Sequence, residues 1–526
     1  MLVQCGHCRK PVNTERDMVG GIVGGVILDE SVLLPTQSDQ DYDDNPSLQL
    51  QPGAEILLRK LRYSGIRTGI SYRPGLSFRK ASLLKRTAML YSIDCFTLDT
   101  SSTDASVHEV MLSWRDIGGS ILYLVSDGKK DIFLKLSNCG WLITVLNTEC
   151  GRACESSSII CINKLDELFL TICHLNRKAT GNSVTTVGYI MKPSREEDFA
   201  KRGAFPMYPT HNGLMFLPLT LELPLSPQLQ EVDIVLHKAT DEIISIELSG
   251  SLGFPNNITF TRGMQELKSY MDCHVDCCLI DPLDNIYPVL DRLEIQQILL
   301  GLEDLKTSGY KIRGAHYLKV DDFDEPDFIQ RLSEAKLSLP CIVKPQVACG
   351  VSDAHSMAIV FKVEDFKDLS VPLPAVIQEY VNHSSTLYKF YVLGEKIFHA
   401  VKKSTPNADI LLKLSGANEL RPLVFDSLKS LPSANEKDHS GDNDCSKATS
   451  DCIDHGLVRD AAKCLMRSLG LTIFGFDVVI QEGSGDHVIV DVNYLPSFKE
   501  VPDDVAIPAL WDAIKNKFDS SKKTTT

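Results

Sequence analysis

Apolar runs alternate with segments of helical period through the first third of the chain. Strand patterns and helical patterns follow one another at 20–30, 53–65, 66–72, 77–90 and 120–126. Strand–helix alternation is typical of a parallel sheet covered by helices. We therefore predict that residues 1–182 form an α/β domain of their own, which ends at a polar, glycine-bearing linker near 176–186.

A second α/β unit begins after this linker. A strand that runs directly into a helix is expected at 231–243, and one long helix at 285–305. From residue 339 onwards, consecutive strand patterns predict antiparallel pairs, at 339–346, 357–362, 375–381, 387–403, 474–480 and 487–494. The predicted organisation is a lobe at 186–296, further lobes at 297–510 with a flexible insertion at about 431–455, and a tail at 511–526.

Composition narrows the class of protein mainly by exclusion. The 526 residues are 43% hydrophobic and 23% charged, which is ordinary for a globular protein of several domains. A net charge of −15 argues against a protein that coats nucleic acid. No apolar run reaches the roughly 18 residues that span a membrane, and we expect no signal peptide. The sixteen cysteines are then expected as reduced thiols of a cytoplasmic or nuclear protein.

The candidate chemistry starts in the stretch FGFDVVIQEGSGDHVIVDVNYLP, residues 474–496. Two strand patterns flank a glycine-bearing turn, so a hairpin is predicted. If the turn is centred on Ser484, Asp477 and Asp491 are direct cross-strand neighbours about 5 Å apart at Cβ, with Asn493 on the same face. Opposed like charges destabilise a sheet, and a divalent cation such as Mg²⁺ would offset that. An ordinary solvated face is the alternative.

Cations precede this hairpin in the chain. Lys344 ends a strand just before a small-residue loop at 349–352, an arrangement that can cradle the phosphates of a nucleotide. The strand that ends at Gln378-Glu379-Tyr380-Val381 offers backbone groups that could read an adenine edge. Each signal is weak alone, because a lysine after a strand is commonly a surface residue. Further cations follow across the same region: His355, Lys389, Lys402 and Lys403.

The order of these parts resembles the ATP-grasp fold. More narrowly, the chain resembles the inositol polyphosphate kinase family that includes inositol tetrakisphosphate 1-kinase and inositol 1,3,4-trisphosphate 5/6-kinase. The resemblance covers residues 186–503 and rests on VGYIMKPSR, DIVLHKATDEI, IVKPQVACGVSDAHSMAIVF, VIQEYVNHSSTLYKFYVLGE and FGFDVVI…HVIVDVNYLPSF. The implied activity is ATP- and Mg²⁺-dependent phosphorylation of inositol tris- and tetrakisphosphates, within inositol polyphosphate and phytate metabolism. The implied protein is a monomer that binds neither nucleic acid nor membrane.

The resemblance also implies roles for individual residues. Lys389 and His355 are implied as catalytic residues, and two Mg²⁺ ions are expected on Asp477, Asp491 and Asn493. ATP, the co-substrate, is implied to contact Arg292, Lys344, Gln378, Glu379, Tyr380, Val381, Lys389 and Ser404. The inositol phosphate is implied to contact Arg195, Lys238, His355, Lys389 and Asn493. No nucleophilic side chain is required, because an inositol hydroxyl attacks the γ-phosphate directly.

Three positions depart from the family pattern: Arg195 stands where a lysine is common, Cys349 replaces a polar residue, and Ser497-Phe498 replaces Gly-Tyr. None removes an implied phosphate or metal ligand. The alternatives are an ATP-grasp carboxylate–amine ligase and a pseudokinase scaffold. A ligase needs an amino-acid pocket, whereas Lys238, His355 and Lys389 suit a polyanion.

The first domain resembles the haloacid dehalogenase-like phosphohydrolases, and its presence suggests a long plant-type member of the kinase family. A strand ends at Asp29, where that family has its nucleophile, and the next strand ends at Ser71. The family needs a second aspartate two residues after the first, and this chain has Ser31 there. We therefore expect this domain to be catalytically inactive.

Overall fold

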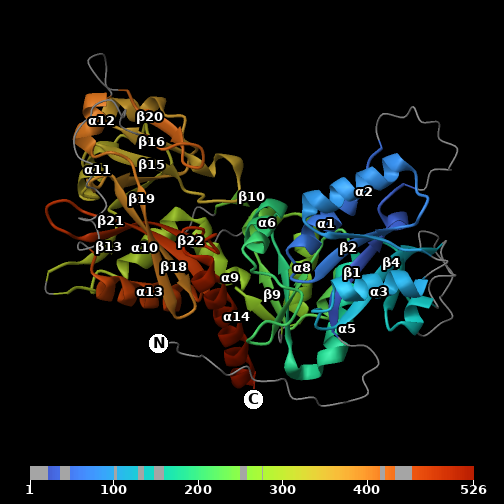
Figure 1. The fold of residues 1–526 in the computed structure, drawn as a ribbon. Helices are drawn as coiled ribbons and strands as arrows, with labels where there is room; N and C mark the ends of the chain where they lie inside the picture. Colours follow the sequence, from blue (N-terminus) through green and yellow to red (C-terminus); the bar gives the residue numbers. More distant parts are fainter. Residues whose placement is uncertain are drawn as a thin grey trace, which may run out of the picture. The chain divides into compact units, whose positions relative to one another are not determined.

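The computed structural model describes residues 22–35, 48–99, 103–127, 135–146, 159–248, 257–274, 277–307, 309–414, 421–432 and 453–525. Most of the predicted insertion at 431–455 lies outside these ranges. The chain forms two compact units, which are described separately (Figure 1). Unit 1 comprises residues 1–184 and 206–209, and unit 2 comprises 185–205 and 210–526.

Unit 1 is built on a six-stranded sheet in the order β3-β2-β1-β4-β5-β6, and every neighbouring pair is parallel. Helices alternate with the strands, as the sequence pattern predicted. Its strands are β1 (Val23–Asp29), β2 (Arg67–Tyr72), β3 (Asp94–Thr97), β4 (Ser120–Ser126), β5 (Leu142–Leu146) and β6 (Ile159–Ile162). Its helices are α1 (Ala54–Arg62), α2 (Phe78–Tyr91), α3 (Thr103–Ser113) and α5 (Glu167–Thr180).

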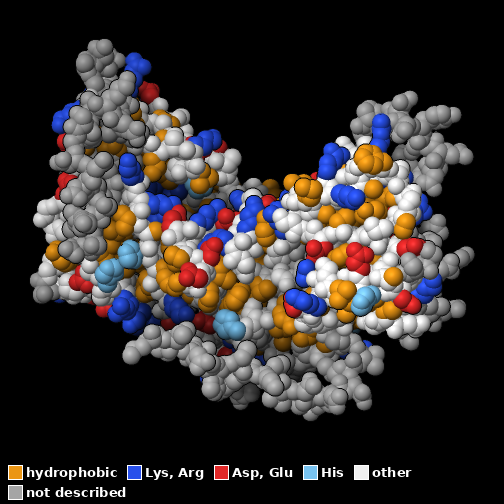
Figure 2. Space-filling model, in the orientation of Figure 1, with side chains coloured by type: hydrophobic (Ala, Val, Ile, Leu, Met, Phe, Trp, Pro, Cys, Tyr) orange, Lys and Arg blue, Asp and Glu red, His pale blue; other side chains and the backbone are white. Residues whose placement is uncertain are grey.

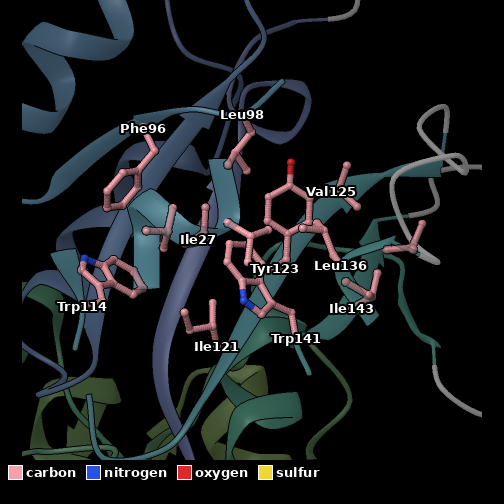
Figure 3. Packing of buried hydrophobic residues seen from close by; sticks show 13 residues of the cluster. Ile27, Phe96, Leu98, Trp114, Ile121, Tyr123, Val125, Leu136, Trp141 and Ile143 are labelled. Carbon is pink, nitrogen blue, oxygen red and sulfur yellow. The ribbon is translucent and has the colours of Figure 1, made fainter. Parts of the chain in front are cut away.

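Aliphatic and aromatic residues together fill the core on one face of this sheet (Figure 3). Trp114 packs edge-on against Phe96, with ring centroids 5.5 Å apart. The glycine at position 25 makes room for Trp114, because a Cβ there would lie 2.6 Å from the indole ring. Packing of an aromatic side chain on the sheet therefore explains why a glycine stands at position 25.

Unit 2 contains a second parallel sheet, in the order β12-β9-β7-β8. Its strands are β7 (Thr185–Ile190), β8 (Leu214–Pro218), β9 (Ile234–His237) and β12 (Cys278–Ile280), and the nearby helices are α6 (Pro193–Lys201), α7 (Leu225–Leu229) and α8 (Arg262–Cys273). The prediction of a helix directly after β9 is wrong. A single 3₁₀ turn, Ala239–Glu242, follows instead, and the chain then forms the antiparallel pair of β10 (Ile243–Glu247) and β11 (Asn257–Phe260). Three isoleucines in β10 favour the strand, because β-branched residues fit a pleated surface.

The central sheet of unit 2 is antiparallel and has the order β14-β17-β15-β16-β20. One of its faces packs a core around Val343, Ile377 and Phe366, all fully buried. The strands are β14 (Tyr317–Val320), β15 (Cys341–Pro345), β16 (Ser356–Val360), β17 (Ala375–Glu379) and β20 (Leu423–Asp426), with α11 (Phe328–Glu334) and α12 (Ala408–Leu414) beside them in sequence.

The third sheet of unit 2 carries the candidate metal hairpin and has the order β13-β22-β21-β18-β19. Its strands are β13 (Ile312–Gly314), β18 (Thr386–Leu393), β19 (Lys396–Lys403), β21 (Ile473–Ile480) and β22 (His487–Tyr494). The helices α10 (Arg292–Leu300) and α13 (His455–Leu469) each pack against β13. The last helix, α14 (Asp503–Thr525), packs on both β18 of this sheet and β12 of the parallel sheet.

Two further expectations about helices need correction. The single helix expected at 285–305 is divided into α9 (Leu283–Ile286), a 3₁₀ turn that contains Pro288, and α10. The break falls at Asp291, whose extended backbone and side chain cap α10. The residues set apart as a tail from 511 continue α14, because Ile514 and Phe518 are buried. Within the described ranges, we find no helix with the length and apolarity needed to cross a bilayer.

Candidate active site

Two aspartates face each other on the hairpin of β21 and β22. Asp477 pairs directly with Asp491, which confirms the predicted pairing. The symmetric turn assumed from the sequence is not the cause, because Val478 pairs with Ile489 and the register then shifts. The extra residue is Val490, a β-bulge, and it restores the alignment of the two aspartates.

The bulge also supplies the hydrogen-bond acceptor for Lys344 on β15. Nζ of Lys344 donates to the carbonyl oxygen of Val490 at 3.1 Å. Burial lowers the pKa of Lys344 to about 8, and the nearby Asp491 acts in the opposite direction. A buried amine with this contact lies beside the aspartates, where a polyphosphate would need a cation.

Lys389 on β18 forms an ion pair with Asp477, its cross-strand partner. Its Nζ lies 2.9 Å from Oδ2 and 3.3 Å from Oδ1 of the carboxylate. Burial is the largest influence on Asp477 and, together with Asp491, raises its pKa to about 6 against the opposing effect of Lys389. Burial therefore makes the charged carboxylate of Asp477 costly in spite of the ion pair.

The donors on this face fit a small hard cation. Asp477 and Asp491 supply carboxylates, and Asn493, whose Nδ2 donates to Asp491 at 3.0 Å, supplies an amide. Among the described residues, no group of three or more His, Cys, Asp or Glu side chains is arranged to hold a metal. Mg²⁺ suits so small a donor set, because it keeps several waters and completes its shell with substrate phosphates.

A pocket of about 250 Å³ lies beside Asp477. Figure 2 shows Lys and Arg side chains beside Asp and Glu on the face of unit 2 near the labels of β22 and β10 in Figure 1. The pocket brings together five predicted site residues: Arg195, Lys238, Lys389, Asp477 and Asn493. The rest of its lining is Phe390, Tyr391, Lys402, Gly475, Tyr494, Leu495, Pro496, Ser497 and Glu500.

Lys238 and Arg195 reach this pocket from the parallel sheet and α6. Nζ of Lys238 donates to the carbonyl oxygen of Tyr494 and lies 4.9 Å from the centre of that ring. The lysine is 9% exposed, and burial lowers its pKa to about 8. Nε of Arg195 donates to Oδ2 of Asp241 at 3.3 Å. Both cations are held in place before any ligand binds.

The predicted adenine hinge, Gln378-Glu379-Tyr380-Val381, ends β17 and continues beyond it. The carboxylate of Glu379 is bound by Arg313 and accepts from the backbone N–H of His316 at 2.7 Å. The backbone N–H of Glu379 donates to the carbonyl of His316 at 3.0 Å. Tyr380 donates its hydroxyl to the carbonyl of Pro406 at 2.5 Å. The hinge is thus fixed by its neighbours.

Nine predicted site residues are absent from the described lining of the pocket: Asp491, Lys344, the hinge residues Gln378, Glu379, Tyr380 and Val381, and the three residues Arg292, His355 and Ser404. Arg292 is 7% exposed, and its guanidinium donates to backbone carbonyls of the loop after Lys344: Pro345, Val347, Ala348 and Ala354. The ring of His355 lies 3.3 Å from the hydroxyl of Ser427. Ser404 donates its backbone N–H to Ser385 at 2.7 Å, directly after β19. Arg292 therefore holds the glycine-bearing loop in this structure.

The predicted site residues did not include Tyr391 or Glu500, and Lys402 was noted only as one cation of the region, without an assigned role. Lys402 pairs with Glu500, and the hydroxyl of Tyr391 donates to Glu500 at 2.5 Å. The alternation of side chains along a strand would have indicated Tyr391, because Tyr391 lies two residues after Lys389 on β18 and points to the same face of the sheet. Glu500 lies in a loop after β22, where no periodicity marks the direction of a side chain.

Unit 1 places Asp29 at the end of β1, in a closed environment. Its carboxylate accepts from the backbone N–H of Ser31 at 2.9 Å and from the hydroxyl of Tyr123 at 2.5 Å. The hydroxyl of Ser71 lies 3.5 Å from the same carboxylate. Asp29 is 2% exposed, so its carboxylate is covered by these partners.

Each of the two units matches the model of a known family. Residues 18–178 match the model of the family "ITPK4, N-terminal HAD-like domain", and residues 315–511 match "Inositol 1,3,4-trisphosphate 5/6-kinase ATP-grasp domain". These matches confirm the predicted fold class, an ATP-grasp unit preceded by a haloacid dehalogenase-like domain.

The chain is 50% identical over 502 residues to inositol-tetrakisphosphate 1-kinase 6 of Oryza sativa subsp. indica, an alignment that covers 95% of this chain and 90% of the relative. It is 27% identical over 302 residues to inositol-tetrakisphosphate 1-kinase of Danio rerio, covering 55% of this chain and 69% of the relative. A D-alanine–D-alanine ligase from Bacillus anthracis aligns with a TM-score of 0.39 at 13% identity, over 65% of this chain and all of the ligase.

Proposed function

We propose that this chain, which belongs to the inositol-tetrakisphosphate 1-kinase family, transfers the γ-phosphoryl group of ATP to a hydroxyl of an inositol tris- or tetrakisphosphate. The observation that carries the proposal is the pocket in which Arg195, Lys238, Lys389 and Lys402 surround a space beside Asp477. Four cations around one small space suit a ligand with several phosphates.

The two substrates are assigned to opposite sides of the aspartate pair. Lys344 and the loop held by Arg292 lie on the central sheet, and we assign them to the phosphates of ATP together with the backbone of the hinge. Arg195 and Lys238 line the pocket, and we assign them to the phosphates of the inositol ring. Lys389 lies between the two sides, so it is placed to contact the transferred group.

Catalysis by these residues consists of positioning and charge stabilisation. The inositol hydroxyl attacks the γ-phosphorus, a new O–P bond forms, and the bond to the leaving oxygen of ADP breaks. Negative charge spreads over the equatorial oxygens in the transition state. Lys344 and Lys389 stabilise this charge from fixed positions, while the hinge and the pocket hold the reacting atoms in line.

Mg²⁺ is assigned to Asp477, Asp491 and Asn493, and we propose two ions. When bound, Mg²⁺ neutralises phosphate charge and orients the transferred group. Lys389 would then exchange part of its contact with Asp477 for a contact with phosphate. Arg292 is assigned to support of the loop in addition to the phosphate contact that the family pattern implies.

The proposal is tested by incubating the protein with ATP, Mg²⁺ and a panel of inositol phosphates and separating the products by anion-exchange chromatography. We expect a product with one additional phosphate and one equivalent of ADP. A carboxylate–amine ligase would instead release ADP only with a carboxylate and an amine. ATP binding with no turnover of any panel member would favour a scaffold without kinase activity.

A further inference from the structure

The cations of the pocket are not equally available to a ligand. Lys389 is paired with Asp477, which we assign to Mg²⁺, so ligand binding itself changes this pair. Lys238 contacts a backbone carbonyl, which carries no net charge. Lys402 differs from both, because its partner Glu500 has no place among the assigned metal ligands. Arg195 is also paired with a carboxylate, that of Asp241, but Asp241 does not line the pocket, whereas Glu500 does. The end of the pocket at Lys402 is therefore already neutralised by a carboxylate.

Glu500 is held as a charged acceptor between two side chains. Lys402 forms an ion pair with it, and Tyr391, 5% exposed, donates its hydroxyl to the same carboxylate at 2.5 Å. Burial opposes ionisation of Glu500, but the hydrogen bonds from Lys402 and Tyr391 outweigh it and lower the pKa of Glu500 to about 2. A negative charge therefore persists here at every pH at which the protein would work.

The loop that carries Glu500 has a defined conformation. Phe498 has a φ of +37°, a region that bulky residues rarely adopt, and its side chain is fully buried against Phe199 of α6 with ring centroids 5.2 Å apart. Arg202 donates to the carbonyls of Ser497 and Phe498 at 2.5 and 3.2 Å. Packing and hydrogen bonds offset the backbone strain and fix the direction in which the loop enters the pocket.

We propose that Glu500 is a specificity-determining residue, which engages Lys402 and makes this end of the pocket accept a ring hydroxyl in preference to a ring phosphate. The inference rests on the proposed function and specifies which substrates that site prefers. A carboxylate accepts hydrogen bonds from hydroxyl groups and repels a phosphate, which carries about −1.5 to −2 charges at neutral pH. Because Glu500 already offsets the charge of Lys402, this lysine would attract such a phosphate less strongly than an unpaired ammonium would.

The matched substitution is Glu500→Gln, which removes the charge and keeps the shape. The probes are pairs of inositol polyphosphates, a trisphosphate and the tetrakisphosphates that extend it by one phosphate. For at least one such pair, we expect the ratio of kcat/KM, tetrakisphosphate over trisphosphate, to rise about tenfold, since like charges that are partly exposed repel moderately. Lys402→Met leaves the carboxylate without its cation, so the ratio for the same pair should fall.

The control is Lys499→Gln, which removes the charge adjacent in sequence. Lys499 pairs with Asp198 at 2.9 Å and does not line the pocket. The ratio of kcat/KM measured for this variant should therefore match that of the unchanged protein. The inference is overturned if Glu500→Gln and Lys402→Met shift the ratio in the same direction, or if neither shifts it. Calorimetric binding of the same pairs without ATP gives a second readout. Selective binding without turnover would refute the proposed kinase activity and leave the selectivity supported.

Discussion

Replacing Lys238 with methionine should weaken binding of the inositol phosphate and leave ATP binding nearly unchanged. The side chain is 9% exposed, and the fall of its pKa from 10.5 to about 8 on burial corresponds to about 3 kcal/mol that disfavours the charged amine in the free protein. A charge-assisted hydrogen bond to phosphate contributes roughly 1.5–3 kcal/mol. We therefore expect the KM for the inositol phosphate to rise roughly tenfold to a hundredfold, with the KM for ATP within about twofold.

The same lysine predicts a pH dependence with a definite sign. Its pKa is lowered in the folded protein, so the charged amine destabilises the fold below about pH 8, and this penalty disappears as the pH rises toward 10.5. Binding of a polyanion needs the charged form, so affinity should fall as the pH passes about 8. The charges around Lys238 are Arg195, Lys192, Asp241 and the thiol of Cys349, and burial outweighs them all.

Calorimetry with the inositol phosphate alone isolates this effect from Lys344, which also has a pKa near 8 but is assigned to ATP. In the methionine variant, the loss of affinity above pH 8 should be absent. Lys389 does not contribute to the loss of affinity above pH 8, because its pKa is raised. Burial lowers this pKa, but the nearby Asp477 outweighs that effect. Equal changes in both KM values, or a pH dependence that persists in the variant, would show that Lys238 has a structural role.

Three further outcomes are expected. Asp491→Asn should lower kcat at least about a hundredfold while circular dichroism stays unchanged, because charge beside the transferred phosphoryl group is lost; near-normal turnover at ordinary Mg²⁺ would exclude the metal assignment. Deleting residues 1–180 should leave a folded, ATP-dependent kinase, which ATP binding and product chromatography would check. Isolated unit 1 should hydrolyse no phosphomonoester, because Asp29 is covered by Tyr123 and Ser31 replaces an acid–base carboxyl group; hydrolysis that disappears in Asp29→Asn would contradict this.

The period of the apolar residues, together with the residue types, was sufficient to predict a strand wherever that strand is buried and continuous. The strands of unit 1 and the hairpin that carries Asp477 follow directly from apolar runs between turn residues. The pairing of Asp477 with Asp491 was predicted correctly from a symmetric turn, although the actual cause is a bulge at Val490. A bulge is a local change of register, and the alternation of apolar and polar residues in the sequence does not indicate where it occurs.

Other features depend on contacts between segments far apart in the sequence. The apolar residues after Lys238 have helical spacing, but several of them are β-branched. The segment forms a strand because it pairs with β11. The phosphate contact of Arg292 is implied by the family resemblance and stays a prediction, whereas its hydrogen bonds to loop carbonyls became visible only in the structure. Glu500 owes its place in the pocket to a loop that is clamped by Arg202, 295 positions before Ser497.

Strand β22 contacts the parallel sheet and both five-stranded sheets of unit 2, so the residues that we assign to the two substrates meet on this strand. On β22, the carbonyl of Val490 binds Lys344 of the central sheet, and Asp491 faces Asp477 of the neighbouring strand. Tyr494, three residues further, is buried and donates its hydroxyl to the carbonyls of His237 and Ile280 in the parallel sheet, at 2.7 and 3.0 Å. Lys344 and Lys238 thus bind the carbonyls of Val490 and Tyr494, on either side of Asp491, so the two cations that we assign to different substrates are both anchored to the strand that carries a proposed metal ligand.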